Sequence, residues 1–135
     1  MNKLLRALIV EDCESDAALL LAELEQAGYE ITYERVQTAE AMREALGRAQ
    51  WDVVLSDYSL PQFSAPAALE VLKATGHDLP FIIISGTIGE DTAVTALKSG
   101  AHDYLVKGRL ARLIPALERE LRDVVGRRDR RMLEE

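Results

Sequence analysis

The 135-residue sequence predicts an α/β fold in which five parallel strands alternate with five helices as a doubly wound sheet. Short apolar runs without helical spacing alternate along the chain with segments whose apolar residues recur every three or four positions. The connections between these segments are short, and right-handed crossovers would therefore place helices on both faces of the sheet. A chain of this length can bury a core without disulfides or structural metals.

The first half of the chain is expected to supply three strands and two helices. The strands are expected at residues 4–10, 29–36 and 51–57. The second strand alternates and is charged on one side, which is typical of a sheet edge. Ser15 or Asp16 is expected to cap the first helix, and Gly28 to end it in the left-handed conformation. A second helix is expected over residues 38–49.

The second half continues the alternation with two more strands, at residues 81–85 and 101–106. A helix is expected to begin at Ser64 or Ala65, where Pro66 suits the first turn, and another at Glu90. Pro115 requires the last helix to begin within a few residues before it. That helix is amphipathic, with one apolar face formed by Leu113, Leu117, Leu121 and Val124.

Charge and cysteine content exclude several classes of function. The net charge is −7, and the excess acid lies in residues 1–117, which hold 10 Lys and Arg against 17 Asp and Glu. Residues 118–135 hold six of each sign, interleaved as on a solvated helix, so no DNA-binding surface is predicted. Cys13 is the only cysteine, which excludes an intrachain disulfide, and we interpret it as a small space-filling residue. No signal peptide or membrane span is predicted, and a cytoplasmic location is expected.

The third predicted strand ends in a carboxylate. Val53 to Leu55 leads into Ser56 and Asp57, and Pro61 forces a turn four residues later. Asp57 could cap the following helix, but that helix is expected to begin too far along the chain. In an open α/β sheet, ligands bind where the strands end. Asp57 is therefore the first candidate for a functional residue.

Further polar residues are expected at the same edge of the sheet, because they follow the ends of three other strands. They are Glu11 and Asp12 after the first strand, Ser85 after the fourth and Lys107 after the fifth. Three neighbouring carboxylates repel one another unless a cation neutralises them. A site with only oxygen ligands indicates Mg²⁺, or Mn²⁺, rather than zinc.

With these residues in place, the chain resembles the receiver domain of bacterial two-component response regulators. The resemblance covers residues 4–125 and depends on the joint positions of the strand-end residues rather than on one motif. It implies a flavodoxin-like (βα)5 fold with the strand order 2-1-3-4-5. It also implies Mg²⁺-dependent phosphorylation of an aspartate by a phosphohistidine donor, followed by hydrolysis, which is not enzymatic activity in the usual sense.

The resemblance assigns roles to individual residues. Asp57 would be the phosphoacceptor, Lys107 its cationic partner and Ser85 a contact to the phosphoryl oxygens. Mg²⁺ would be held by Glu11, Asp12, Asp57 and the main-chain carbonyl of Ser59. Gly86, Thr87 and Ser59 would border the access to the phosphoryl group, and Tyr104 would be the switch aromatic. Three positions depart from the family pattern, namely Gly108 in place of a proline, Gln62 in place of a glycine and Gly86 in place of an alanine.

Each of these residues also has a plainer interpretation. Lys107 could be an ordinary strand-end lysine, Ser85 a turn or helix cap, and Tyr104 a core aromatic. Two other functions were weighed. A phosphatase of the haloacid-dehalogenase type would place a second aspartate where Ser59 stands, and an adaptor that is never phosphorylated would have no reason to gather the acidic residues with Lys107.

The expected partners follow from the resemblance. The phosphodonor would be a histidine kinase or a histidine phosphotransfer protein. Residues 1–125 would form the receiver domain, and residues 126–135 a polar helical extension or linker. That linker would lead to an output domain such as a PAS domain, a kinase or a cyclic-dinucleotide enzyme. The alternative is a homodimer through the fourth helix, fifth strand and fifth helix.

Overall fold

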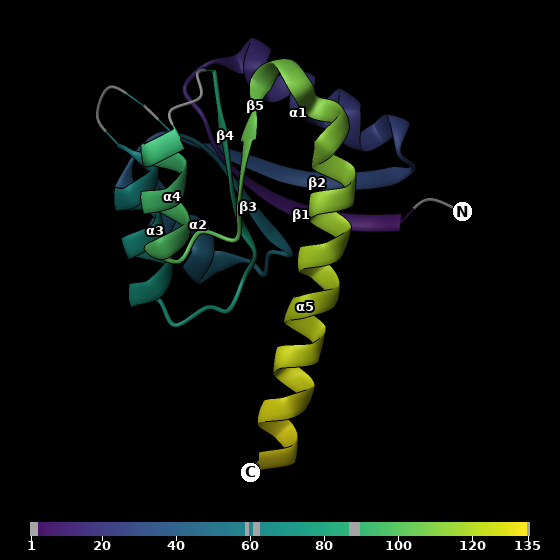
Figure 1. The fold of residues 1–135 in the computed structure, drawn as a ribbon, viewed down its shortest axis with the longest axis vertical. Helices are drawn as coiled ribbons and strands as arrows, with labels where there is room; N and C mark the ends of the chain where they lie inside the picture. The colour runs from purple at the N-terminus through teal and green to yellow at the C-terminus, as the bar shows by residue number, and fades with distance from the viewer. Residues whose placement is uncertain (1–2, 59, 61–62, 87–89, 135) are drawn as a thin grey trace.

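The computed structural model describes residues 3–58, 60, 63–86 and 90–134, with the side chains of residues 90 and 128–134 excepted (Figure 1). Strands and helices alternate along these residues. Their bounds are β1 (Lys3–Val10), α1 (Glu14–Gln26), β2 (Tyr29–Val36), α2 (Ala39–Arg48), β3 (Val53–Asp57), α3 (Ala65–Ala74), β4 (Phe81–Ser85), α4 (Glu90–Lys98), β5 (Asp103–Val106), a 3₁₀ segment (Lys107–Arg112) and α5 (Leu113–Glu134).

The five strands form one parallel sheet in the order β2-β1-β3-β4-β5, which confirms the predicted fold and strand order. β2 lies at one edge, as its charged side predicted. The register aligns the strand ends, because Val10 pairs with Ser56 and Asp57 pairs with Ile84. The loops that follow all five strands therefore meet at a single edge of the sheet.

Helices cover both faces of the sheet. Figure 1 shows α1 and α5 on one side and α2, α3 and α4 on the other. The strand side chains divide accordingly: Leu8 and Val10 of β1 belong to the core beneath α2, α3 and α4, whereas Ala7 and Ile9 belong to the core beneath α1 and α5. All four side chains are fully buried, which explains why β1 reads as a continuous apolar run without alternation.

The helix starts agree with the sequence except at α1. Ser64 caps α3, because its hydroxyl accepts a hydrogen bond from the N–H of Ala67 at 3.3 Å. α1 begins earlier than expected, and its N-cap is Cys13, which makes no side-chain capping bond. The prediction that Ser15 or Asp16 caps this helix is therefore wrong. The interpretation of Cys13 as a space-filling residue is also wrong, because its side chain is exposed.

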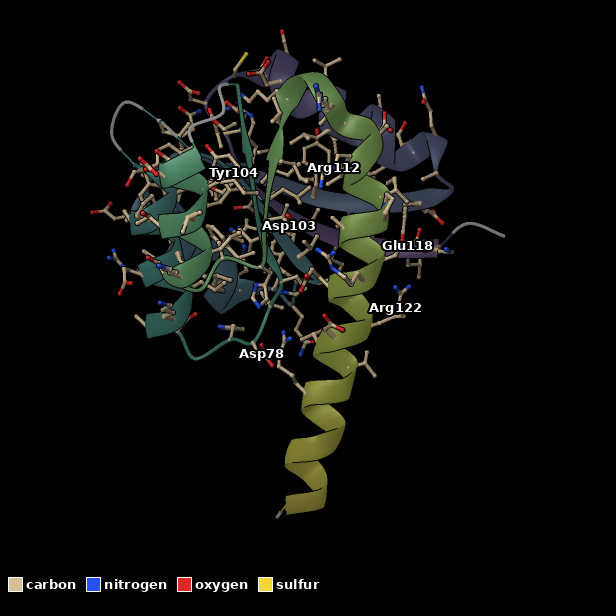
Figure 2. The ribbon with its side chains drawn as sticks, in the orientation of Figure 1. Asp78, Asp103, Tyr104, Arg112, Glu118 and Arg122 are labelled. Carbon is tan, nitrogen blue, oxygen red and sulfur yellow. The ribbon has the colours of Figure 1, made fainter. Side chains whose placement is uncertain are left out.

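The chain reaches α5 through the 3₁₀ segment, and α5 then continues past the rest of the fold (Figure 1). Leu113 and Leu117 are fully buried against the sheet. Two ion pairs also hold the helix against the domain. Arg119 contacts Asp103 of β5 at 2.6 Å, and Arg127 contacts Asp78 at 3.1 Å. Figure 2 shows both aspartates beside α5. In the described part of the chain, no helix is long and apolar enough to cross a bilayer.

Candidate functional site at the carboxyl edge of the sheet

Three carboxylates meet where β1 and β3 end. Glu11 follows β1 directly, and its N–H bonds the carbonyl of Val36 at 3.1 Å, which extends the sheet pairing by one residue. Asp12 is the next residue, and Asp57 is the last residue of β3. One carboxylate oxygen from each of the three acidic residues lies within 4.8 Å of the others. Glu11 is buried, Asp57 is half-buried and Asp12 is exposed, so the group opens to solvent on one side.

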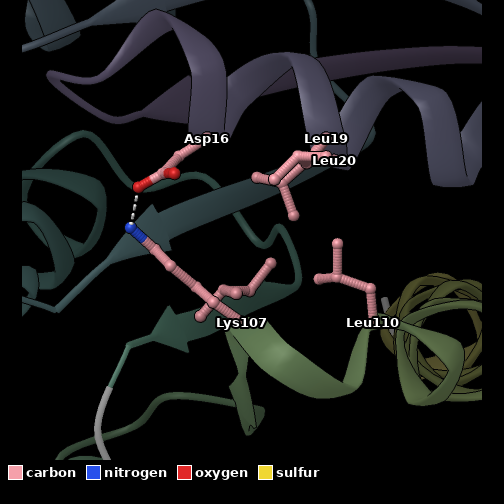
Figure 3. A pocket seen from close by; sticks show the side chains of 6 residues that line it. Asp16, Leu19, Leu20, Lys107 and Leu110 are labelled. Carbon is pink, nitrogen blue, oxygen red and sulfur yellow. Dashed lines mark hydrogen bonds and ion pairs between the residues drawn. The ribbon is translucent and has the colours of Figure 1, made fainter.

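Lys107 is the only lysine that forms ion pairs with these carboxylates among the described residues. It follows β5, and its Nζ lies 3.1 Å from Glu11 Oε2 and 3.4 Å from Asp57 Oδ2. A third carboxylate, Asp16 of α1, lies closer, at 2.5 Å (Figure 3). Burial lowers the pKa of Lys107, but the hydrogen bonds to Asp16 and Glu11 outweigh it and raise that pKa above the ordinary value. Lys107 is therefore protonated at physiological pH.

The raised pKa of Glu11 indicates that a further cation beside its carboxylate would stabilise the ionised form. Burial raises the pKa of Glu11, although the Cys13 N–H, at 3.1 Å, and Lys107 favour the ionised form. The neighbouring charge of Asp57 raises it further. The donor group of Glu11, Asp12 and Asp57 consists of oxygen atoms alone, which suits a hard divalent cation. These residues could therefore hold a metal ion.

Arg35 supports the acidic pair from the neighbouring strand. Its guanidinium donates to the main-chain carbonyls of Glu11, at 3.1 Å, and Asp12, at 3.3 Å. The same side chain pairs with Glu14 of α1 at 3.3 Å. Because both carbonyls are held, the chain direction between β1 and α1 is fixed, and with it the placement of the two carboxylates.

The remaining predicted residues lie around this group. Ser85 ends β4 and is buried, and Gly86 follows it and is exposed. A Cβ added at Gly86 would meet no atom within 4 Å. Tyr104 of β5 is half-buried and packs against Tyr58, with ring centroids 6.2 Å apart. The main-chain carbonyl of Ser59, and Thr87, lie outside the described residues.

The structure thus brings four of the predicted residues into one cluster, namely Glu11, Asp12, Asp57 and Lys107. The sequence interpretation missed Asp16 and Arg35. Asp16 was assigned to helix capping, and the only signal for Arg35 was the charged side of β2. Both residues reach the cluster from α1 and β2, and the contact depends on how those elements are oriented.

Comparison with known proteins identifies the family. Residues 7–118 match the model of the response regulator receiver domain. The transcriptional regulatory protein ZraR of Escherichia coli K12 is 35% identical over 103 residues, which are 74% of this chain and 22% of ZraR. The chemotaxis protein CheY1 of Helicobacter pylori is 26% identical over 105 residues, which are 76% of this chain and 85% of CheY1.

A solved structure agrees with these matches. The receiver domain of NtrC4, determined as a beryllofluoride-activated dimer, has a TM-score of 0.76 and is 27% identical, covering 88% of this chain and 98% of that one. The chain spans about a fifth of the length of ZraR. The matched residues 7–118 contain the second half of β1, the other four strands and every member of the acidic cluster. The chain therefore belongs to the family of response regulator receiver domains, the signalling modules of two-component systems.

Proposed function

We propose that Asp57 is the phosphoacceptor of this receiver domain and takes its phosphoryl group from a phosphohistidine. The observation that carries the proposal is the position of the Lys107 ammonium, 3.4 Å from Asp57 and 3.1 Å from Glu11, beside three gathered carboxylates. An anionic carboxylate can attack an anionic phosphoryl group only where fixed positive charge offsets the charge that develops on the phosphoryl oxygens.

Glu11, Asp12 and Asp57 are the proposed ligands of Mg²⁺, with Mn²⁺ as an alternative. They meet the requirement for oxygen ligands, and the cation would offset the burial and, to a smaller extent, the Asp57 charge that raise the pKa of Glu11. The main-chain carbonyl of Ser59 is a further proposed ligand. When bound, the ion supplies positive charge at the oxygens of the phosphoryl group.

The proposed transfer uses residues from three strand ends. A carboxylate oxygen of Asp57 attacks phosphorus, the phosphorus–nitrogen bond of the phosphohistidine breaks, and the imidazole keeps the electron pair. Lys107 neutralises one phosphoryl oxygen, and the Ser85 hydroxyl donates to another. Gly86 and Thr87 would border the path by which the donor, and later water, approaches. Water then attacks phosphorus, which releases inorganic phosphate and restores the Asp57 carboxylate.

The proposed output is a change in the surface formed by α4, β5 and α5. Ser85 would move towards the phosphoryl oxygens, and Tyr104 would turn inward from its half-buried position against Tyr58. The donor is proposed to be a histidine kinase or a histidine phosphotransfer protein. The surface would then bind a second copy of the chain or control an output domain such as a PAS domain, a kinase or a cyclic-dinucleotide enzyme. Residues 126–135 would form the helical connection to it.

Intact-mass measurement after incubation with a small phosphodonor and MgCl₂ tests the assignment of Asp57. The wild-type chain should gain the mass of one phosphoryl group, and Asp57→Asn should gain none. Asp52→Asn is the matched control, because Asp52 lies just before the opposite end of the same strand and should not affect labelling. Equal labelling of Asp57→Asn and wild type would refute the assignment.

A further inference from the structure

We propose that Asp16 is a positioning residue for Lys107, one that holds the ammonium aside so that Glu11 and Asp57 can bind a metal ion. This inference rests on the proposed function of the site. The Lys107 Nζ lies 2.5 Å from Asp16 Oδ2, compared with 3.1 Å from Glu11 and 3.4 Å from Asp57. Among the three carboxylates that Lys107 contacts, Asp16 is thus its nearest partner.

The face of α1 that carries Asp16 borders the same small pocket as Lys107. Leu19 and Leu20 follow Asp16 by three and four residues, so the three side chains lie on one side of the helix. Together with Leu110 they line a small pocket, and Lys107 lines it as well (Figure 3). Lys107 and the leucines thus border the same small cavity, and the Lys107 ammonium bonds the Asp16 carboxylate at its edge (Figure 3).

Asp16 differs from the other two partners of Lys107 in what else it can bind. Among the described residues, the carboxylates that lie within 4.8 Å of one another are Glu11, Asp12 and Asp57, and Asp16 is outside that group. A metal ion and the ammonium would compete for Glu11 and Asp57, and two neighbouring cations repel each other. Asp16 offers the ammonium a nearer carboxylate that is not one of the proposed metal ligands. It also adds negative charge beside the metal site.

The test is a double-mutant cycle with Mg²⁺ binding as the readout. MgCl₂ is titrated by calorimetry into wild type, Asp16→Asn, Lys107→Gln and the double variant. Asp16→Asn should weaken Mg²⁺ binding about 3- to 10-fold, as expected for a partly exposed charge pair of modest strength. Lys107→Gln should tighten binding, because it removes the competing ammonium. In that background, Asp16→Asn should have little further effect.

A matched control separates positioning from simple charge. Glu14→Gln removes one negative charge from the same turn of α1, but Glu14 pairs with Arg35 and has no contact to Lys107 among the described ion pairs. When Lys107→Gln is already present, Asp16→Asn should weaken Mg²⁺ binding only as much as Glu14→Gln weakens it in the wild-type chain. An effect of Asp16→Asn that is equally large with and without Lys107 would overturn the inference and leave the proposed metal site intact. A wild-type chain that binds no Mg²⁺ would instead refute that metal site, and the inference with it.

Discussion

Glu11 is the residue at which folding and the proposed function conflict most directly. Its side chain is 2% exposed, yet it must be ionised to bind a cation. The Cys13 N–H and Lys107 offset part of the cost of burying that charge, but the net effect is a raised pKa. The folded, metal-free chain therefore favours the protonated form of Glu11 more strongly than the unfolded chain does.

This conflict predicts a pH-dependent gain in stability for Glu11→Gln. Because the folded pKa is raised, the stabilisation that comes from protonation is fully present below the ordinary value of 4.5 and is lost as the pH rises through the folded pKa. At pH 7 without metal, the variant should be more stable than wild type, because it does not bury an ionised carboxylate. At pH 4 the difference should shrink.

Urea unfolding in the presence of a chelator at both pH values measures this difference. Glu25→Gln, on the exposed side of α1, serves as the control for a general loss of negative charge. A stability difference between Glu11→Gln and wild type that grew at pH 4 would contradict the assigned direction of the pKa shift.

Individual site residues were predictable where their position is fixed by a strand end. Asp57 and Lys107 each follow a short apolar run, and the ends of parallel strands must meet at one edge. Asp16 could not be found in this way, since its contact with Lys107 depends on the rotation of α1 about its own axis. Cys13 was misjudged for a related reason: the helix begins directly after it and leaves its side chain in solvent.

At the scale of elements, α5 combines burial and exposure along one helix. Leu117 is completely buried against the sheet, whereas Val125, two turns further, is 54% exposed. Arg119 and Arg127 hold the flanks of the helix through Asp103 and Asp78. These contacts hold α5 against the domain as far as Arg127, while the end of the helix extends away from it (Figure 1).

The packing of α5 predicts that two similar side-chain truncations will lower the free energy of unfolding by different amounts. Leu117→Ala should lower the free energy of unfolding by about 2–5 kcal/mol, because it leaves a cavity in the core beneath α1 and α5. Val125→Ala removes a comparable aliphatic group from an exposed site and should cost less than about 0.5 kcal/mol. Urea unfolding compares the two variants directly. Similar losses would mean that α5 does not pack on the sheet at Leu117.

The bounds of a helix or strand were predictable where neighbouring residues in the sequence determine them, and not where contacts with distant residues do. β4 has the predicted bounds, because an apolar run lies between a proline and glycine-containing loops. β3 begins later than predicted, since Trp51 is buried without pairing as a strand and its indole N–H bonds the Ala45 carbonyl of α2 at 2.9 Å. The 3₁₀ segment was missed, because nothing in its sequence distinguishes it from the first turn of α5.

At the scale of the whole molecule, the site and the proposed output surface share β5. Tyr104 lies on that strand, three residues before Lys107, which follows it, and α4 and α5 flank the strand. A change at the proposed phosphoacceptor could therefore reach the surface formed by α4, β5 and α5 through a single strand. The strand order and both helical layers were predictable, because short connections and right-handed crossovers leave few alternatives for five βα units.

Hydrogen exchange with and without beryllofluoride, a phosphoryl mimic, tests this route. With MgCl₂ present, protection should change between Ser85 and Arg109 and along α5, since the mimic should draw Ser85 towards it and leave room for Tyr104. Asp57→Asn should show no change. Changes confined to α1 and α2 would contradict the proposed route.

The residues of the site are far apart in the sequence, so the site can form only late in the synthesis and folding of the chain. Lys107 is 50 residues from Asp57 and 91 residues from Asp16 along the sequence. During synthesis the acidic residues leave the ribosome long before their lysine, and contacts this distant form late because they require long loops to close. A nascent or truncated chain therefore carries the proposed acceptor carboxylate without its cationic partner. On the proposed function, the chain can accept a phosphoryl group only after β5 has joined the sheet.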